Sequence, residues 1–418
     1  MKCEKGNTYT EKRGAIMNKI EVRHVSKIFG KNSKAGLELL KQGLTKNQIK
    51  KKTGMNLGVS DASFEVHEGE IFVIMGLSGS GKSTLVRMLN RLIEPTSGTV
   101  RIDDQELTAM SKNELRRVRR KNISMVFQGF ALFPHRNLLD NVAYGLEIRK
   151  IDKEERQEKA KQALRLVGLE GYENSSPAQL SGGMQQRVGL ARALASDTDI
   201  LLMDEAFSAL DPLIRKDMQD QLLELQSEMH KTIVFITHDL DEALRIGDRI
   251  ALMKDGRIVQ IGSPEDILMN PANEYVEHFV EDVDISKVIT AGRIMSRADA
   301  IQIDRGPRVA LQIMSDAGIS SIFAVDRMKK FKGVIYAEDA ADAAKEKQSS
   351  DDIVKQVEPV TMDAKLSDLF ERISKSALPL PVIDEKGRLR GIVRRPAVIQ
   401  ALAGNLPAPS ERIEVKTS

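Results

Sequence analysis

The sequence predicts an α/β fold for residues 17–280, built on a parallel β-sheet. The chain holds three short, mainly apolar runs, at 71–75, 200–203 and 232–236. Runs without polar alternation are typical of strands buried on both faces, as in a parallel sheet covered by helices. Stretches with the apolar period of a helix accompany them, such as 153–167 and 215–229. Buried strands that alternate with amphipathic helices indicate an α/β domain.

Length and composition indicate an ordinary globular protein of roughly two to three domains. The chain has 418 residues, 41% apolar and 29% charged, and its net charge of +3 is too small to indicate a nucleic-acid partner. A single cysteine, Cys3, excludes a disulfide framework and favours a reducing compartment. No apolar run approaches the roughly 18 residues that a spanning helix needs. If the protein serves a membrane, we expect it at the cytoplasmic face, as a peripheral subunit.

Changes in composition divide the chain into four predicted regions. Residues 1–16 are polar, lack the apolar core of a signal peptide and are expected to be disordered. The α/β domain follows over 17–280 and ends near a linker that contains Pro271. A second domain is expected over 281–405, and a disordered tail over 406–418.

The second predicted domain contains a weak internal repeat. Segment 323–336 (FAVDRMKKFKGVIY) aligns with 381–394 (PVIDEKGRLRGIVR). Each copy reads as a strand, an acidic turn, a basic stretch, a glycine and a second strand, and a helical pattern precedes each. Such a repeated unit resembles a tandem pair of CBS modules, which pack together as one α+β domain. The alternative is a pair of unrelated hairpins.

A glycine-rich loop follows the first apolar run. It fits the pattern G-x-x-x-x-G-K-[ST] with Gly76, Leu77, Ser78, Gly79, Ser80, Gly81, Lys82, Ser83 and Thr84. Glycines let backbone N–H groups curl around phosphate oxygens, and the helix expected over 83–92 directs its positive end at the same anion. Lys82 reaches the β- and γ-phosphates of ATP, and the Ser83 hydroxyl binds Mg²⁺. A strand before the loop and a helix after it argue against a chance glycine-rich turn.

The apolar run at 200–203 ends in two acidic residues. At the carboxyl end of a parallel strand, Asp204 can hold Mg²⁺ through water. Glu205, the next residue, can polarise the water that attacks the γ-phosphate. Two acids after a strand are usually a solvated strand end, but downstream of a phosphate loop the pair predicts a site of ATP hydrolysis.

The segment 180–187 (LSGGMQQR) resembles the signature motif of ABC ATPases. It is a second anion-binding arrangement, because Ser181, Gly182 and Gly183 precede a predicted helix. The phosphate loop supplies its own ligands, so the second arrangement is expected to hold the γ-phosphate of an ATP bound to another subunit. The resemblance therefore implies a head-to-tail homodimer that closes around ATP. The alternative is a Ser-Gly-Gly helix cap.

The resemblance also implies a P-loop NTPase fold with a helical subdomain, and roles for four further residues. Gln128 matches the Q-loop glutamine, a ligand of Mg²⁺ and water that also senses the membrane subunit. Asp211 matches the D-loop, which crosses the dimer interface, and His238 matches the switch histidine, which contacts the γ-phosphate. Phe29 matches the aromatic residue that stacks on adenine, although tyrosine is more usual there and phenylalanine also suits a core position.

Two features narrow the resemblance to one branch of the ABC ATPases. An extra basic helical segment at about 31–52 and the CBS-like repeat resemble the ATPase subunit of bacterial quaternary-amine importers, which take up glycine betaine and proline betaine. The resemblance implies membrane permease subunits and, indirectly, an extracytoplasmic substrate-binding protein as partners. The alternatives are an importer of another substrate and a soluble ABC ATPase. The chain has one cassette and no sustained heptads, which disfavours the second.

The CBS-like repeat departs from the usual nucleotide-binding pattern. CBS pairs often bind adenine nucleotides through a hydroxyl and an acid after the second strand, but Tyr336 stands there in one copy and Arg394 in the other. Both copies are instead basic. Their cationic residues are Arg327, Lys329, Lys330 and Lys332, and Lys386, Arg388, Arg390, Arg394 and Arg395. These residues form either a solvated surface or a contact with an anionic membrane surface, which salt would weaken.

Overall fold

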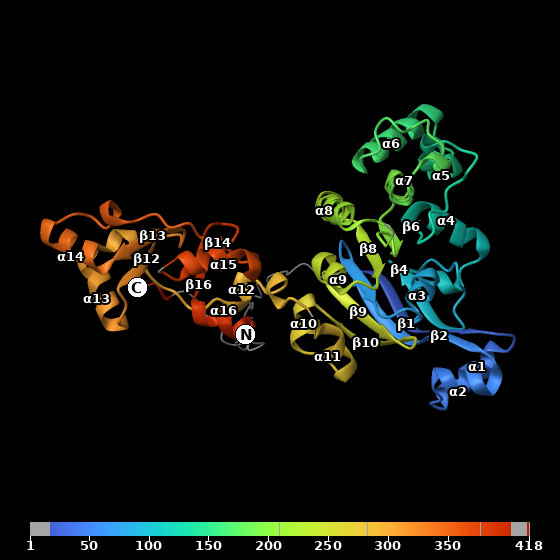
Figure 1. Cartoon of the computed structure of the whole chain (residues 1–418), viewed down its shortest axis with the longest axis horizontal. Helices are drawn as coiled ribbons and strands as arrows, with labels where there is room; N and C mark the ends of the chain where they lie inside the picture. The colour runs from blue at the N-terminus through green and yellow to red at the C-terminus, as the bar shows by residue number, and fades with distance from the viewer. Residues whose placement is uncertain (1–16, 209, 282, 377, 403–415, 418) are drawn as a thin grey trace, which may run out of the picture. The chain divides into compact units, whose positions relative to one another are not determined.

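The computed structural model describes residues 17–208, 210–281, 283–376, 378–402 and 416–417 (Figure 1). The chain separates into two compact units, which divide after Glu281. The disorder predicted for residues 1–16 and for most of the tail concerns residues outside these ranges. Within the described ranges, no helix combines the length and the apolar character that crossing a membrane requires.

A mixed β-sheet forms the centre of the first unit, with the strand order β10-β9-β3-β8-β7-β6. These strands are β3 (Ile71–Met75), β6 (Ile123–Val126), β7 (Ile200–Asp204), β8 (Thr232–Thr237), β9 (Arg249–Lys254) and β10 (Arg257–Gly262). The strands from β9 to β6 run parallel, and β10 runs antiparallel to β9. Every residue of β3, β7 and β8 is buried, which confirms the predicted parallel sheet covered on both faces.

A second, antiparallel sheet shares its core with the first. It comprises β1 (Asn18–Phe29), β2 (Asn56–His67), β4 (Ser97–Ile102) and β5 (Gln105–Glu106), in the order β2-β1-β4-β5. Apolar residues of both sheets and of helix α3 (Lys82–Leu89) belong to one buried cluster. Within this cluster, the rings of Phe64 and Phe72 stack with their centroids 5.1 Å apart. The shared core fixes α3, which follows β3 along the chain, against both sheets.

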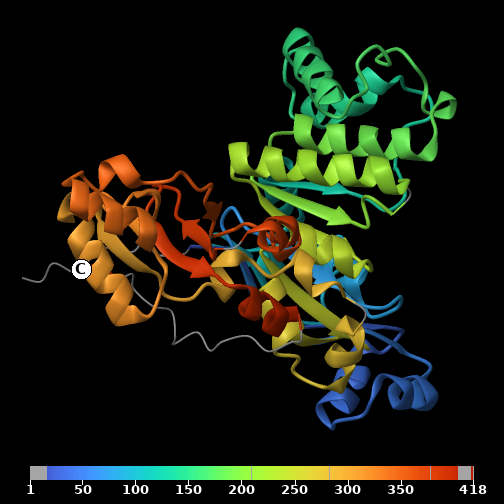
Figure 2. The same cartoon turned by 60° about the vertical axis from the view of Figure 1, so that its left-hand side comes forward.

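Helices α5 (Leu138–Ile148), α6 (Lys153–Leu166) and α7 (Gly182–Ala195) pack on one another as a helical subdomain. In Figures 1 and 2 they form a green group that stands away from the blue strands β1 and β2. The other helical elements of the unit, apart from the insertion, are α4 (Lys112–Asn122), α8 (Pro212–Met229), α9 (Leu240–Ile246), α10 (Pro264–Met269), α11 (Glu274–Val280) and the 3₁₀ turns η1 (Leu107–Ala109) and η2 (Pro177–Gln179). The helical subdomain agrees with the predicted fold.

The basic insertion after β1 is helical, as the sequence predicts. It forms α1 (Ser33–Lys41) and α2 (Lys46–Thr53). Ile49 of α2 is buried in a small cluster with Ile28 of β1 and Leu57 of β2. This cluster attaches the insertion to the antiparallel sheet.

The second unit consists of two halves with the same order of elements. The first half contains β11 (Asp299–Gln302), α13 (Pro307–Ala317), β12 (Ser321–Val325), β13 (Phe331–Tyr336) and α14 (Ala337–Glu346). The second half contains β14 (Val360–Thr361), α15 (Leu366–Lys375), β15 (Leu380–Ile383), β16 (Leu389–Val393) and α16 (Arg395–Leu402). In each half the first two strands are parallel and the last two form an antiparallel hairpin. The alternative of two unrelated hairpins is therefore wrong.

The two hairpins of the second unit meet at their turns. The Phe331 amide donates to the Gly387 carbonyl, and the Leu389 amide donates to the Lys329 carbonyl, each at 3.0 Å. Short elements complete the unit, namely η3 (Ile285–Lys287), α12 (Ala291–Ile294), η4 (Ile303–Arg305), η5 (Asp351–Ile353) and β17 (Lys416–Thr417). β17 pairs in parallel with β11, so these two residues of the tail form a strand where the sequence predicts disorder.

Candidate active site

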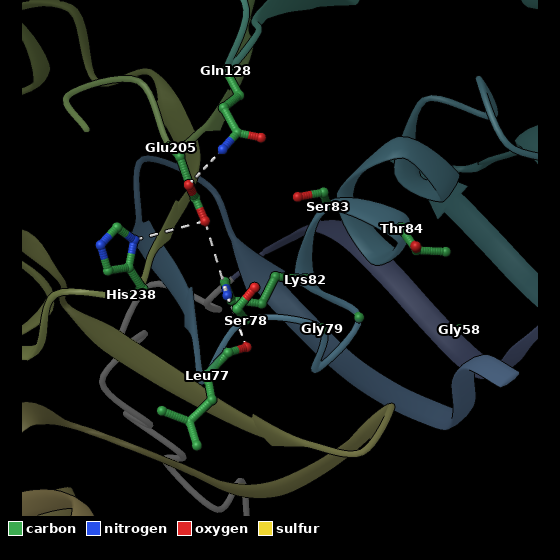
Figure 3. A pocket seen from close by; sticks show the side chains of 11 residues that line it. Gly58, Leu77, Ser78, Gly79, Lys82, Ser83, Thr84, Gln128, Glu205 and His238 are labelled. Carbon is green, nitrogen blue, oxygen red and sulfur yellow. Dashed lines mark hydrogen bonds and ion pairs between the residues drawn. The ribbon is translucent and has the colours of Figure 1, made fainter. Parts of the chain in front are cut away.

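The glycine-rich loop joins β3 to α3 and lines a cavity of about 520 Å³ (Figure 3). The residues around this cavity are Gly58, Leu77, Ser78, Gly79, Gly81, Lys82, Ser83, Thr84, Gln128, Glu205 and His238. All of them except Gly58 are among the site residues predicted from the sequence. They come from the loop, from β2 and from the segments that follow β6, β7 and β8.

Only glycine fits the position just before α3. Gly81 has a φ of +106°, and a Cβ there would lie 2.3 Å from the carbonyl oxygen of Gly58. Gly81 also brings no side chain that could cap the helix. The first amides of α3 are therefore available to a ligand, which is how a helix N-terminus binds phosphate.

Lys82 is buried beside the loop. Its Nζ donates to the carbonyl oxygens of Gly76, at 2.8 Å, and Leu77, at 3.2 Å. Burial lowers the pKa of the Lys82 ammonium, and the nearby carboxylates of Glu205 and Asp204 act in the opposite direction. The loop therefore encloses a cation at the floor of the cavity, where a polyphosphate would pair with it.

Asp204 ties the loop helix to the central sheet. Its carboxylate is fully buried at the end of β7. The Ser83 hydroxyl donates to Oδ1 at 2.8 Å, and Nη2 of Arg87 donates to Oδ2 at 3.0 Å. The structure thus brings together two of the three predicted magnesium ligands, Ser83 and Asp204. Arg87 is a contributor that the sequence reasoning missed, although it lies one helical turn after Ser83 and so on the same face.

Glu205 gathers three of the predicted side chains around its carboxylate (Figure 3). Gln128 Nε2 donates to Oε2 at 2.8 Å, while His238 Nδ1 lies 3.7 Å and Lys82 Nζ 4.0 Å from Oε1. Glu205 has a φ of +49°, and its amide donates to the Ile236 carbonyl of β8 at 3.2 Å. The carboxyl ends of β6, β7 and β8 therefore place an amide, a carboxylate and an imidazole side by side, as expected at one edge of a parallel sheet.

Phe29 lies beside Gly58, which lines the cavity, and is not buried in the core. Its side chain is 40% exposed at the end of β1. A Cβ on Gly58 would lie 2.8 Å from Cε2 of Phe29 and 3.2 Å from Cγ2 of Thr84. Gly58 thus leaves the space between the Phe29 ring and the loop helix. This exposure disfavours the core alternative, and the stacking role of Phe29 stays a prediction.

The remaining predicted residues do not line the cavity. Ser181 and Asp211 cap helices, accepting from the amides of Met184 at 3.3 Å and Ile214 at 3.0 Å. Gly182 and Gly183 form the first turn of α7. Ser80 is buried in the loop, where its Oγ has no hydrogen-bond partner within the described part of the chain. Ser181 therefore does cap α7 within its own chain, as the alternative interpretation predicts. This cap does not exclude an anion at the N-terminus of the same helix.

Comparison with known families assigns both units. A family model described as "ABC transporter" matches residues 59–208, which include the loop, Gln128, the signature segment and Glu205. A second model, the "CBS domain", matches residues 351–404, which contain the second half of the C-terminal unit. Both matches agree with the fold and the repeat described above.

Relatives with curated names match nearly the whole chain. The "Glycine betaine transport ATP-binding protein OpuAA" of Bacillus subtilis is 65% identical over 93% of this chain and 93% of its own. The "Glycine betaine/carnitine transport ATP-binding protein GbuA" of Listeria monocytogenes is 57% identical over 93% of this chain and 98% of its own. The "Glycine betaine/proline betaine transport system ATP-binding protein ProV" of Escherichia coli is 51% identical over 92% of this chain and 97% of its own.

A solved structure shares the fold of the first unit. The "Dimeric Structure of MJ0796, a Bacterial ABC Transporter Cassette" is 34% identical, with a TM-score of 0.52, over 59% of this chain and 98% of that one. The same cassette is also known as a dimer in a post-hydrolysis state bound to ADP and Pi. The chain therefore belongs to the family of ABC transporter ATP-binding proteins that includes the glycine betaine transport ATP-binding proteins.

Proposed function

We propose that this ATPase powers the import of glycine betaine or a related quaternary amine, as a homodimer attached to membrane permease subunits at the cytoplasmic face. The main support for the proposed ATP hydrolysis is a cluster beside the phosphate loop, in which Gln128, His238 and Lys82 surround Glu205. The assignment of the substrate is based on the names of the relatives, because the transported molecule does not contact this subunit. A substrate-binding protein outside the membrane would be an indirect partner.

In the proposed reaction, the ATP phosphates enter the cavity against the loop amides. Lys82 exchanges its two carbonyl contacts for the β- and γ-phosphates, which it neutralises. Glu205 accepts the proton of the attacking water, and His238 and Gln128 hold that water and the γ-phosphate in line. The carboxylate can reach that water because Glu205 and the phosphate loop follow strands of the same sheet and line one cavity.

The residues present fit a magnesium ion. Ser83 Oγ, Asp204 and the Gln128 side-chain carbonyl are hard oxygen donors, the type Mg²⁺ prefers. Among the described residues there is no cluster of three or more His, Cys, Asp or Glu side chains that could hold a metal by itself. When bound, Mg²⁺ would neutralise charge on the β- and γ-phosphates.

The signature segment is proposed to complete the site of a second copy. Ser181 and Gly182 are exposed at the N-terminus of α7 and lie outside the cavity of their own chain. A helix N-terminus with two glycines can approach a γ-phosphate closely. Closure of the two copies would then move the permeases, and hydrolysis would reopen them.

Transport by the purified complex tests the substrate assignment. The full chain, isolated with its membrane partners and placed in vesicles that contain ATP, is expected to take up labelled glycine betaine. An inactive complex with Glu205→Gln serves as the control. ATP-dependent uptake of another solute, with none of glycine betaine, carnitine or proline betaine, would contradict the assignment.

A bulky cation in the signature segment should block closure. Ser181→Arg is expected to leave ATP binding to the single chain unchanged and to abolish the ATP-dependent dimer, because the guanidinium fills the space intended for the γ-phosphate. Gel filtration with ATP measures the dimer, and Gln162→Arg on exposed α6 is the control. A dimer that survives Ser181→Arg would refute the shared site.

We also propose that exposed cations of the CBS module contact an anionic membrane surface. Five of the predicted basic residues are held within the module, namely Arg327 by Asp304, Lys332 by Asp326, Arg388 and Arg390 by Asp384, and Arg395 by the carbonyls that end α15. Within the described residues, exposed Lys329, Lys330, Lys386 and Arg394 have no ion pair. These four are therefore the candidates for a lipid contact.

The contact is proposed to hold the transporter inactive. Salt should weaken it, because the Debye length of the solution falls to about 8 to 10 Å at an ionic strength of 0.1–0.15 M. In vesicles of fixed anionic lipid content, raising internal salt should activate transport. Replacing the four free cations with glutamine should make transport active already at low salt, because each is worth about 1 kcal/mol near such a surface. The control replaces Lys345 and Lys375, which pair with Asp342 and Glu371. An unchanged salt threshold in the fourfold variant would exclude the membrane contact.

A further inference from the structure

The helical insertion is a strongly basic element attached to the nucleotide-binding unit. Between residues 31 and 52, seven residues are lysines and Glu38 is the only acid. The matched family model begins after this segment, at residue 59. The insertion therefore adds positive charge that lies outside the matched part of the cassette.

The insertion is held rigidly where α2 begins. Thr45 and Gln48 form a capping box, in which each side chain bonds the backbone amide of the other. Ile49 is fully buried against β1 and β2. Lys46 lies three residues before Ile49 on the same face of α2, so the buried side chain directs Lys46 toward the body of the domain.

Lys46 reaches the phosphate loop itself. Its Nζ donates to the carbonyl oxygen of Gly79 at 2.9 Å, and Gly79 lines the cavity. Gly79 has a φ of +77°, in the middle of the loop. A lysine from an inserted helix thus bonds the backbone that is expected to surround the phosphates.

The contact constrains the loop through peptide geometry. A trans peptide is planar, so its C=O and N–H point in opposite directions. Holding the Gly79 carbonyl toward Lys46 turns the N–H of the same peptide, that of Ser80, to the other side, where it donates to the Leu77 carbonyl at 3.2 Å. Leu77 is also a partner of Lys82. Lys46 and Lys82 thus both stabilise the curved backbone of the loop, Lys46 through the Gly79 carbonyl and Lys82 through the Leu77 carbonyl.

We propose that Lys46 is a nucleotide-positioning residue, which raises the affinity for ATP by fixing the phosphate loop and by adding a positive charge beside a polyanion. It acts on binding and not on the chemical step, because its side chain bonds a backbone carbonyl of the phosphate loop. The Glu205 carboxylate bonds a different residue, Gln128. A charge near a cleft also raises the local concentration of an anionic ligand.

The test separates binding from chemistry. Lys46→Met keeps the apolar stem and removes the charge and the donor. We expect the KM for ATP and the Kd for a fluorescent ATP analogue to rise about three- to tenfold, the net scale of one exposed hydrogen bond. kcat should stay unchanged. Lys46→Arg, which restores charge and donor, should return both constants toward the native values.

A matched control distinguishes the contact from general charge. Lys41 belongs to the same insertion, but its Nζ pairs with Glu38 at 3.1 Å, so Lys41→Met should change neither constant. Equal effects of Lys41→Met and Lys46→Met would contradict the proposal, as would an unchanged Kd in Lys46→Met. A fall in kcat alone would assign Lys46 to the chemical step instead. The melting temperature without nucleotide checks the fold, and Lys46→Gln provides a second neutral variant.

Discussion

Replacing Glu205 with glutamine should reduce steady-state ATP hydrolysis by about 10²-fold or more while ATP binding persists, because a positioned base contributes on that scale. Glutamine has nearly the same shape and still offers an oxygen to Gln128, whose Nε2 lies 2.8 Å from the native carboxylate. What it loses is the ability to accept the proton of the attacking water. ATP should then hold the two copies together, and gel filtration should show a stable dimer.

The control for this variant is another Glu→Gln change in the same unit. Glu158 is exposed on α6, where its carboxylate accepts a hydrogen bond from Gln162, so its replacement should leave hydrolysis at the native rate. A Glu205→Gln protein that turns over ATP at nearly the native rate would remove Glu205 from the role of base.

The second large effect is expected at Lys82. Lys82→Ala should weaken ATP binding by on the order of 10²-fold, because the phosphates lose a buried cation with charge-assisted hydrogen bonds. The carbonyls of Gly76 and Leu77 also lose their donor at 2.8 and 3.2 Å, so the loop would be less well ordered before ATP arrives. Calorimetric titration with ATP measures the affinity directly.

Two comparisons make the Lys82 result interpretable. The melting temperature of Lys82→Ala without nucleotide shows whether the domain still folds. Lys34→Ala, at an exposed position of α1, removes a lysine that belongs to the insertion and not to the loop. An ATP affinity equal to that of the native chain would contradict the assignment of the phosphate loop.

Much of the central sheet could be predicted because burial on both faces leaves a simple pattern. The runs at 71–75, 200–203 and 232–236 are strands, but β7 and β8 each continue one residue further, to Asp204 and Thr237. A polar residue reads as a strand end in sequence. Asp204 is nevertheless fully buried, because Ser83 and Arg87 satisfy both of its oxygens from a distant segment.

The residues that the sequence did not reveal act through contacts between distant segments. Gly58 shapes the cavity because its carbonyl approaches Gly81, and Lys46 matters because α2 packs where it does. No motif or periodicity records these pairings. Arg87 is different, since its spacing from Ser83 was available as a signal.

The roles predicted for Ser181 and Asp211 across a dimer interface remain predictions, because their local structure already accounts for them. Ser181 and Asp211 each cap a helix, a sufficient reason for their residue types in a single chain. α8 accordingly begins at Pro212, earlier than the 215–229 stretch expected from periodicity, because Asp211 starts the helix. A role across a dimer interface must therefore be tested with two copies.

Complementation between two inactive variants tests the shared site most directly. Two Lys82→Ala chains together lack both phosphate-loop cations, and two Ser181→Arg chains together have both signature segments blocked. A mixed dimer would retain one complete site, formed by Lys82 of one chain and Ser181 of the other. Mixing the two purified variants should therefore yield ATP hydrolysis well above that of either alone. If each site lies within one chain, the mixture will be no more active than the average of the two variants, and the head-to-tail dimer is wrong.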